Sequence, residues 1–283
     1  MLPTGPVELP AAPLPGPFGR FYLQELINQG GMAEIWLATD QQNRSFALRR
    51  MQRTGAFDFS SKKRFLRGCE IHSKIHHHEL VIGYVEHGKI EGTPYLLMDY
   101  VEGENLKVLQ NLADESLGNH VGNILIDMAV ALEHMHDCGF MHLDFKPENV
   151  MISRNVNVRL IDFDLAQPIP KGNLKLAKMP GTPSYMAPEQ LKKDGIDHRV
   201  DIFAFGVTAY ELLTGVKPFP GETPDEVLRQ QLDMHFLKPP RDVNPQIPLA
   251  LERTILKCLE RDPNRRHPIL STLVLELKSA LYV

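Results

Sequence analysis

The stretch "MHLDFKPENVMI", Met141–Ile152, places Asp144, Lys146, Glu148 and Asn149 inside an otherwise apolar run. Charged groups in an apolar setting cost stability unless partners or a ligand hold them. Asp144 and Asn149 also have the D-x-x-x-x-N spacing in which an aspartate accepts a hydroxyl proton and an asparagine binds magnesium. The stretch therefore predicts an active site, either working or vestigial.

Further motifs follow it in a fixed order. "LIDFDL" offers Asp162 as a second ligand for magnesium, which prefers oxygen donors and takes few of them from protein. "GTPSYMAPEQ" covers Gly181–Gln190, and "DIFAFG" covers Asp201–Gly206. Together these motifs resemble those of the eukaryotic-like Ser/Thr protein kinases, the bacterial branch most of all, and the resemblance extends over Phe18–Val283.

The resemblance implies an α+β, bilobal protein-kinase fold, with a small antiparallel β-sheet lobe carrying one helix and a larger, mainly helical lobe. We expect a flexible proline-rich arm at residues 1–17, the N-terminal lobe at 18–98, a hinge at 99–102 and the C-terminal lobe at 103–283. The arm contains six prolines, which favour extended geometry. Two such lobes predict a cleft between them as the ligand site.

Hydrophobic periodicity places strands in the first third of the chain and helices in the remainder. Alternating apolar residues predict strands over residues 20–27, 33–39, 45–51, 81–88 and 94–101. Helical spacing predicts helices over residues 61–75, 121–139, 199–215, 248–263 and 268–283. The helix at 199–215 is apolar nearly all round, so we expect it to be buried and central.

The resemblance also implies two cofactors, ATP and Mg²⁺, and the residues that serve them. Asp144 would be the catalytic base, with Lys146 beside the γ-phosphate. Asn149 and Asp162 would bind magnesium. The adenine slot, gatekeeper, hinge and phosphate grip of the family fall on Ile27, Gly30, Ile35, Ala47, Arg49, Met98, Asp99, Val101 and Met151.

Most departures from the family pattern fall on the residues that hold the nucleotide phosphates, here called the phosphate grip. In "INQGGMAEIW" only Gly30 survives of the three loop glycines, which weakens close backbone approach to phosphate. The strand lysine is Arg49, whose planar fork is bulkier than an ammonium group. The helix glutamate that pairs with this lysine falls on Gly68, and Glu70 lies about 200° further round the helix.

The switch elements depart as well. D-F-G reads Asp162–Asp164, and we interpret its last residue as a solvated or strained loop aspartate in preference to an extra metal ligand. His142–Asp144 lacks the arginine that clamps a phosphorylated loop, and the loop "LAQPIPKGNLKLAKMP" contains no Ser, Thr or Tyr. We therefore expect that phosphorylation of this loop does not switch the protein.

These observations favour a Mg-ATP-binding signalling protein of the Ser/Thr kinase family, either a pseudokinase or a weakly active kinase. The alternative is an active Ser/Thr protein kinase that transfers the γ-phosphate of ATP to protein hydroxyls. Both interpretations imply a protein substrate or a regulatory protein partner.

The composition excludes several other classes of function. A net charge of -4 argues against a nucleic-acid partner. The sequence shows no apolar run long enough for a membrane span and no signal peptide at its start. Cys69, Cys138 and Cys258 lie far apart, as expected of free thiols in a reducing compartment, so we expect a cytoplasmic location.

Overall fold

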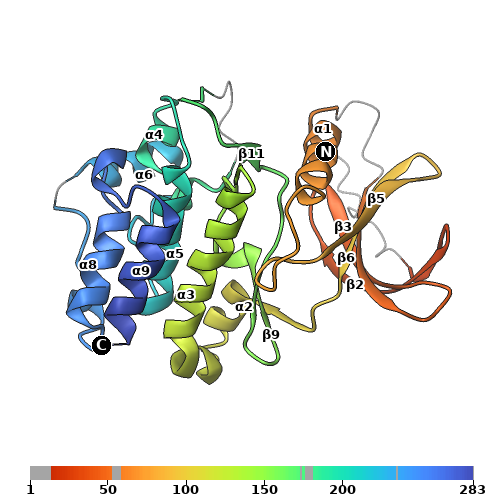
Figure 1. Cartoon of the computed structure of the whole chain (residues 1–283), viewed down its shortest axis with the longest axis horizontal. Coiled ribbons are helices and arrows are strands. Elements are labelled where there is room, and N and C mark those ends of the chain that lie inside the picture. The colour runs from red at the N-terminus through yellow and green to blue at the C-terminus, as the bar shows by residue number, and fades with distance from the viewer. Residues whose placement is uncertain (1–13, 53–58, 173, 176–180, 234, 283) are drawn as a thin grey trace, which may run out of the picture. The chain divides into compact units, whose positions relative to one another are not determined.

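The computed structural model describes residues 14–52, 59–172, 174–175, 181–233 and 235–282. They form two compact units (Figure 1). The first contains the described residues up to Ser61 together with Val85–Tyr100, and the second contains Lys62–Tyr84 and the described residues from Val101 onward. Among the described residues, no helix combines the length and the apolar character needed to cross a membrane.

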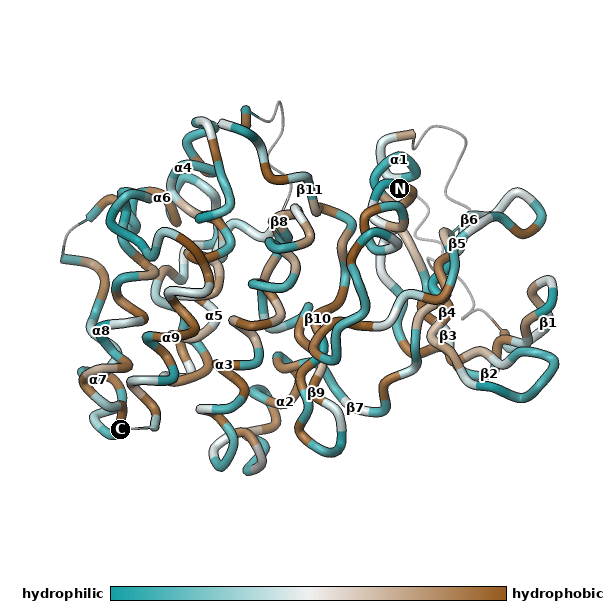
Figure 2. The backbone as a smooth tube through the Cα atoms, viewed as in Figure 1, coloured by the Kyte–Doolittle hydropathy of each residue, from teal (hydrophilic) through white to brown (hydrophobic). Residues whose placement is uncertain are grey.

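The first unit is built on a six-stranded sheet with the order β1-β2-β3-β4-β6-β5. Each neighbouring pair from β1 to β6 in this order is antiparallel. Its strands are β1 (Gly16–Phe18), β2 (Phe21–Gln29), β3 (Ala33–Thr39), β4 (Ser45–Met51), β5 (Tyr84–Ile90) and β6 (Thr93–Asp99). The polar turn between β3 and β4, residues 40–44, is hydrophilic throughout (Figure 2). β3 and β4 have the bounds that alternation predicts.

Among the ends of predicted strands that differ from the structure, two involve backbone pairing that the sequence did not predict. The last residues of the predicted arm, Gly16 and Pro17, pair with Leu23 and Tyr22 in β1, while residues 1–13 lie outside the described residues. Proline is compatible with this position because β1 is an edge strand. β5 begins later than expected, since Val81 instead forms a bridge with Leu160.

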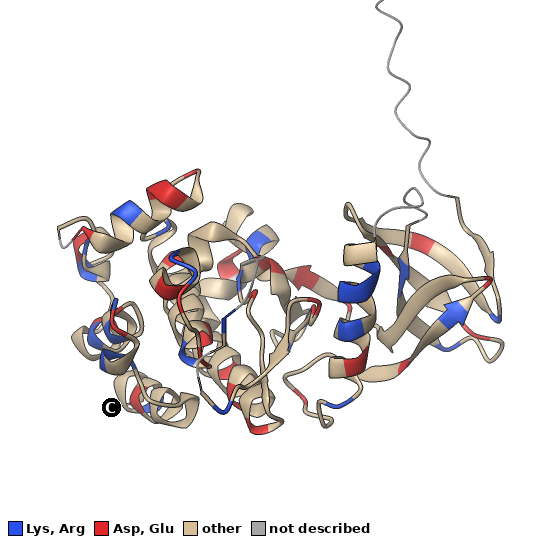
Figure 3. Ribbon diagram, turned by 90° about the horizontal axis from the view of Figure 1, so that it is seen from above, with Lys and Arg blue, Asp and Glu red and all other residues tan. Residues whose placement is uncertain are grey.

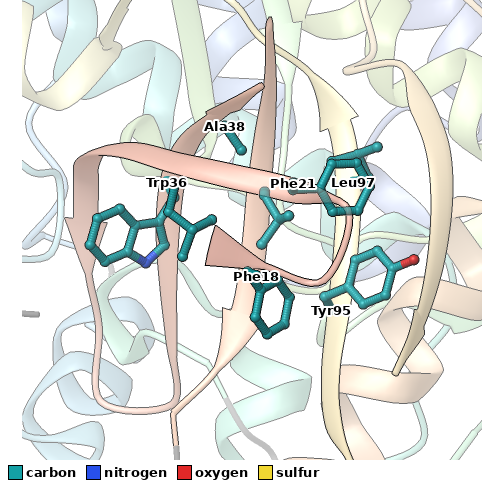
Figure 4. Packing of buried hydrophobic residues seen from close by; sticks show 8 residues of the cluster. Phe18, Phe21, Trp36, Ala38, Tyr95 and Leu97 are labelled. Atoms are coloured by element: carbon teal, nitrogen blue, oxygen red, sulfur yellow. The ribbon is translucent and has the colours of Figure 1, made fainter. Parts of the chain in front are cut away.

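One face of the sheet carries a hydrophobic core, in which aromatic rings from separate strands meet (Figure 4). The Tyr95 ring lies edge-on to Phe18 and Phe21, with centroid separations of 6.0 and 5.9 Å. Trp36 and Leu48 are fully buried beside them. The alternation of β3 and β4 thus puts every second side chain into this core.

The second unit is mainly helical. Its helices are α1 (Phe59–His72), which begins just before the unit, α2 (Leu106–Asn111), α3 (Glu115–Asp137), α4 (Pro188–Leu191), α5 (Arg199–Thr214), α6 (Pro224–Leu232), α7 (Pro240–Val243), α8 (Leu249–Cys258) and α9 (Leu270–Leu281). Short 3-10 turns are η1 (Pro147–Asn149), η2 (Pro183–Tyr185) and η3 (Pro263–Arg265). Two small sheets, β10-β9-β7 and β11-β8, complete it, from β7 (Gly103–Asn105), β8 (Phe140–Met141), β9 (Val150–Ser153), β10 (Val158–Leu160) and β11 (Gln167–Pro168).

The predicted central helix, α5, is buried from Val200 to Glu211 and packs against α3 and α8 (Figure 1). It ends at Gly215, whose φ of 75° is the left-handed conformation that favours glycine. The expectation of a buried central helix is confirmed.

The ends of three predicted helices need correction, and the first of them is α8, which ends at Cys258 and not at Pro263. α3 begins at Glu115, ahead of the predicted start at Val121. The prediction missed the first turns because they are mostly exposed and polar and show no apolar period. α1 ends at His72 and not at Ile75. Figure 3 shows several Lys and Arg residues along α1, whereas its buried residues are Phe65, Gly68, Cys69, Ile71 and His72.

We predict that Gly206→Ala lowers the free energy of unfolding by about 1–3 kcal/mol. A Cβ at Gly206 would lie 2.7 Å from Cys258 Cβ and 3.1 Å from Leu259 Cδ2, so α5 and α8 would have to separate. The control is Gly122→Ala on α3, where the nearest atom, Leu281 Cδ2, lies at 3.4 Å. Gly122→Ala should raise the free energy of unfolding by about 0.5–1 kcal/mol, because alanine is the better helix former. Denaturant unfolding followed by circular dichroism measures both, and equal effects would contradict the prediction.

Candidate active site

The loop that contains Asp144 is held by a buried carboxylate on α5. Asp201 is 0% exposed and accepts hydrogen bonds from the backbone N–H groups of His142, at 2.8 Å, and Leu143, at 2.9 Å. His136 Nε2 lies 2.8 Å from the same carboxylate. Leu143 has a φ of 64°, which is unfavourable for a branched side chain, and these bonds hold it there.

The electrostatic surroundings of Asp201 keep it ionised. Burial by itself would raise the pKa of Asp201, but the hydrogen bond and charge of His136, the charge of His142 and the Leu143 N–H outweigh it and lower the pKa. The loop is thus fixed by an anion that accepts bonds through both of its oxygens.

The structure brings together three of the predicted site residues on this loop. Lys146 Nζ lies 2.9 Å from Asp144 Oδ2 and donates to Thr182 Oγ1 at 2.9 Å. Asn149 Nδ2 donates to the carbonyl of Asp144 at 2.8 Å and to its Oδ2 at 3.1 Å. Both of these side-chain contacts to Asp144 end on Oδ2, and neither involves Oδ1.

The two predicted metal ligands come from adjacent segments. β9 and β10 pair antiparallel, and the Ile161 N–H continues the ladder by donating to the Asn149 carbonyl at 3.0 Å. Asp162 therefore follows directly after the residue bonded to Asn149. Its φ of 62° is a conformation that aspartate tolerates better than most residues.

These residues fit magnesium. The hydrogen bonds that Asn149 makes through its side chain are donated by Nδ2, which turns its Oδ1 away as an oxygen donor. A carboxylate and an amide oxygen, completed by water and phosphate oxygens, are the ligands that Mg²⁺ prefers. Asn149 and Asp162 would therefore hold the ion.

In the first unit, four predicted nucleotide-binding residues share one face of the sheet. Arg49 pairs with Ile35, and Ala47 pairs with Met98. Because side chains alternate along a strand, all four project from the face opposite to Trp36. Arg49 and Ala47 thus lie on the same face of the sheet as Ile35 and Met98.

The neighbouring Arg50 has a different task. Its Nε donates to Glu34 at 2.8 Å, and its guanidinium lies 5.2 Å from the Trp36 ring and 5.6 Å from the Phe18 ring. Glu34 also accepts from Trp36 Nε1 at 2.9 Å. The two arginines of "LRRM" thus serve opposite faces, and Arg50 stabilises the core.

The other predicted residues are spread over both units. Ile27 is 46% exposed and lies in an irregularity of β2, and Gly30 sits in the exposed turn before β3. Asp99 is the exposed last residue of β6. In the second unit, Val101 lies just before β7, and Met151 pairs with neighbours in β7 and β10.

The second unit also contains buried polar groups that brace the site. Arg266 donates to both carboxylate oxygens of Glu189, at 2.6 and 2.8 Å. Tyr185 donates to Glu211 at 2.6 Å, and Lys107 donates to the other oxygen of Glu211 at 2.7 Å. Burial and the Glu211 carboxylate raise the pKa of Tyr185 far above its ordinary value, so it stays a donor.

Sequence reasoning missed the roles of Asp201 and Thr182 and misjudged Asp164. A signal for Asp201 was present, because an acidic residue in an otherwise apolar helix needs partners. The hydroxyl of Thr182 gave no local sign that it meets Lys146. Asp164 is only 6% exposed, so of the two expected alternatives, a solvated or a strained loop residue, the solvated one is wrong.

Comparisons with known proteins agree with this geometry. A family model described as protein kinase domain matches residues 21–275. The chain is 30% identical over 273 residues to a probable serine/threonine-protein kinase of Streptomyces coelicolor, covering 93% of this chain and 40% of that protein. It is 32% identical over 256 residues to the serine/threonine-protein kinase PknB of Mycobacterium tuberculosis, covering 88% and 41%. The chain thus spans about two fifths of the length of these curated relatives.

We predict that Asp201→Asn lowers the free energy of unfolding by about 1–3 kcal/mol near neutral pH, because a buried donor loses its acceptor. The pKa of Asp201 lies below its ordinary value of 3.8, so its contribution is complete above that value and is lost as the pH falls through the lower folded-state pKa. Denaturant unfolding should give a constant difference down to about pH 4 and a shrinking one below. The control is Asp194→Asn, which changes an exposed residue. If Asp201→Asn were as stable as the parent, the role of Asp201 in holding the loop would be contradicted.

Proposed function

The chain belongs to the protein kinase domain family, and we propose that it is a Ser/Thr protein kinase that transfers the γ-phosphate of Mg-ATP to hydroxyl groups of a protein substrate. The single observation that carries this proposal is the bonded set formed by Asp144, Lys146, Asn149 and Thr182. A loop that had lost its chemistry would be free to lose these contacts.

Three residues of the set, together with Asp162, have roles in the proposed transfer. Asp144 Oδ1 accepts the proton of the substrate hydroxyl while the hydroxyl oxygen forms a bond to the γ-phosphorus. At the same time the bond between the γ-phosphorus and the β-phosphate oxygen breaks. Lys146 orients Asp144 and offers its positive charge to the γ-phosphate. Asn149 and Asp162 hold magnesium, which neutralises charge on the phosphates when bound.

The first unit contributes an altered nucleotide grip. Ile35, Ala47 and Met98 offer an apolar face for adenine, and Arg49 provides the cation in place of lysine. If the lost glutamate at position 68 removed about 3–4 kcal/mol of transition-state stabilisation, transfer would slow ~10²–10³-fold. A typical kinase rate of ~1–100 s⁻¹ would then fall to roughly 10⁻³–1 s⁻¹.

A second candidate function is a pseudokinase that binds nucleotide and signals through its shape. Arg49, Gly68 and the two missing loop glycines favour it, since all of them weaken the hold on phosphate. Both relatives described above are named as serine/threonine-protein kinases, which supports the active interpretation better.

We further propose a cytoplasmic location and a protein as substrate or regulatory partner. Support for the location comes from Cys69, Cys138 and Cys258, none of which forms a disulfide. The domain boundaries at 18–98, 99–102 and 103–283 belong to the same proposal.

We predict that the parent chain phosphorylates itself or a generic protein substrate and that Asp144→Asn reduces the rate at least ~10²-fold, because proton transfer loses its acceptor. The assay is transfer from labelled ATP with magnesium. The control is Asp127→Asn, which changes a half-buried carboxylate on α3 away from the loop. A parent with no more transfer than Asp144→Asn, while still binding nucleotide, would favour the pseudokinase.

We also predict that ATP with magnesium raises the melting temperature of the parent by several degrees, because a ligand that binds only the folded state stabilises it. Asp162→Asn should lose most of this shift, since it removes a metal ligand. A shift that survives Asp162→Asn unchanged would exclude Asp162 as a magnesium ligand.

A further inference from the structure

Gly68 on α1 and Asp164, in the segment after β10, compete for the same space. A Cβ added to Gly68 would lie 2.7 Å from Asp164 Oδ1, 2.9 Å from its Cα and 3.2 Å from its N. Contacts below 3.0 Å are essentially never seen for a Cβ, and Cα is a backbone atom that cannot rotate aside. As long as Asp164 keeps its place, α1 accepts only glycine at position 68.

Asp164 is held in that place. Its N–H donates to Asp162 Oδ1 at 3.3 Å, and its carbonyl accepts from Arg67 Nη2 at 3.3 Å. The adjoining Phe163 ring packs against His72, with centroids 4.7 Å apart. Because Arg67 and His72 both belong to α1, the segment is anchored along this helix at two points.

The two positions are complementary departures from the family. Protein kinases carry a glutamate on this helix and a glycine in the last position of D-F-G. This chain carries a glycine on the helix and a carboxylate in the last position, and Oδ1 of that carboxylate reaches the place where a side chain at position 68 would begin. Glu70 does not fill the role, because it is exposed while Gly68 and Cys69 are buried.

We propose that Asp164 is a positioning residue that supplies, from the D-F-D segment, the carboxylate that the family places on α1. The proposal rests on the proposed function, because the helix glutamate of kinases serves the cation that holds the nucleotide phosphates. In this role Asp164 does not touch the reacting atoms. Restoring glutamate at position 68 alone cannot restore the family arrangement, since Asp164 stands in its way.

The first test measures stability and needs no nucleotide. Gly68→Glu should lower the melting temperature by about 2–10 °C. Gly68→Glu combined with Asp164→Gly should recover most of the loss, because Oδ1 is removed and a glycine backbone can shift. Gly118→Glu on α3, where a Cβ meets nothing within 4 Å, is the matched control and should lose no stability. If the double variant loses as much stability as the two single variants together, the steric conflict between position 68 and Asp164 is overturned.

The second test measures ATP affinity by calorimetry. Asp164→Asn, which keeps the size and removes the charge, should weaken binding about tenfold or more, both with magnesium and with EDTA. Gly68→Glu with Asp164→Gly should bind more tightly than Asp164→Gly alone, and Asp127→Asn should match the parent.

The outcomes separate the inference from the proposed function. A parent that binds no ATP overturns the proposed function and the nucleotide role of Asp164, while the stability test still decides the steric conflict between position 68 and Asp164. If the parent and Asp164→Asn bind ATP equally well, the inference alone is overturned. A loss confined to the magnesium condition makes Asp164 a metal ligand and overturns the positioning role.

Discussion

The second unit depends on one buried anion. Asp201 sits inside an apolar helix, where a carboxylate is costly, and the cost is offset because its oxygens accept from two consecutive backbone N–H groups and approach His136. The backbone at Leu143 adopts a strained conformation only because these bonds define it. The direction of Asp144, and through it of Lys146 and Asn149, follows from that backbone.

In the first unit the corresponding constraint is the alternation of strand side chains. A shift of one residue in β4 would exchange Arg49 and Arg50, sending one cation into the core and removing the other from the face it shares with Ala47. Arg50 opposes such a shift, because its bond to Glu34 and its contact with Trp36 exist in one register only. The residue that looks like a repeat of Arg49 thus fixes the position of Arg49.

The sequence could predict what local patterns encode. β3, β4 and α5 followed from periodicity, and Asp144, Lys146 and Asn149 lie within one contiguous motif. The early start of α3 escaped because exposed polar turns carry no apolar period. The contacts of Lys146 with Thr182 and of Gly68 with Asp164 join residues far apart in the chain, so each partner taken alone looked like an isolated substitution. The buried state of Asp164 could not be predicted without its long-range partner.

The position of Trp36 has a spectroscopic consequence. It is the only tryptophan of the chain, it is fully buried in the sheet, and its indole is bonded to Glu34 beneath the Arg50 guanidinium. Its fluorescence therefore originates in the first unit alone. Opening of the sheet would expose the indole to water and shift its emission to longer wavelength, whereas loss of the helices around α5 would be silent in this signal. The chain thus carries an intrinsic optical probe that distinguishes the unfolding of one unit from that of the other.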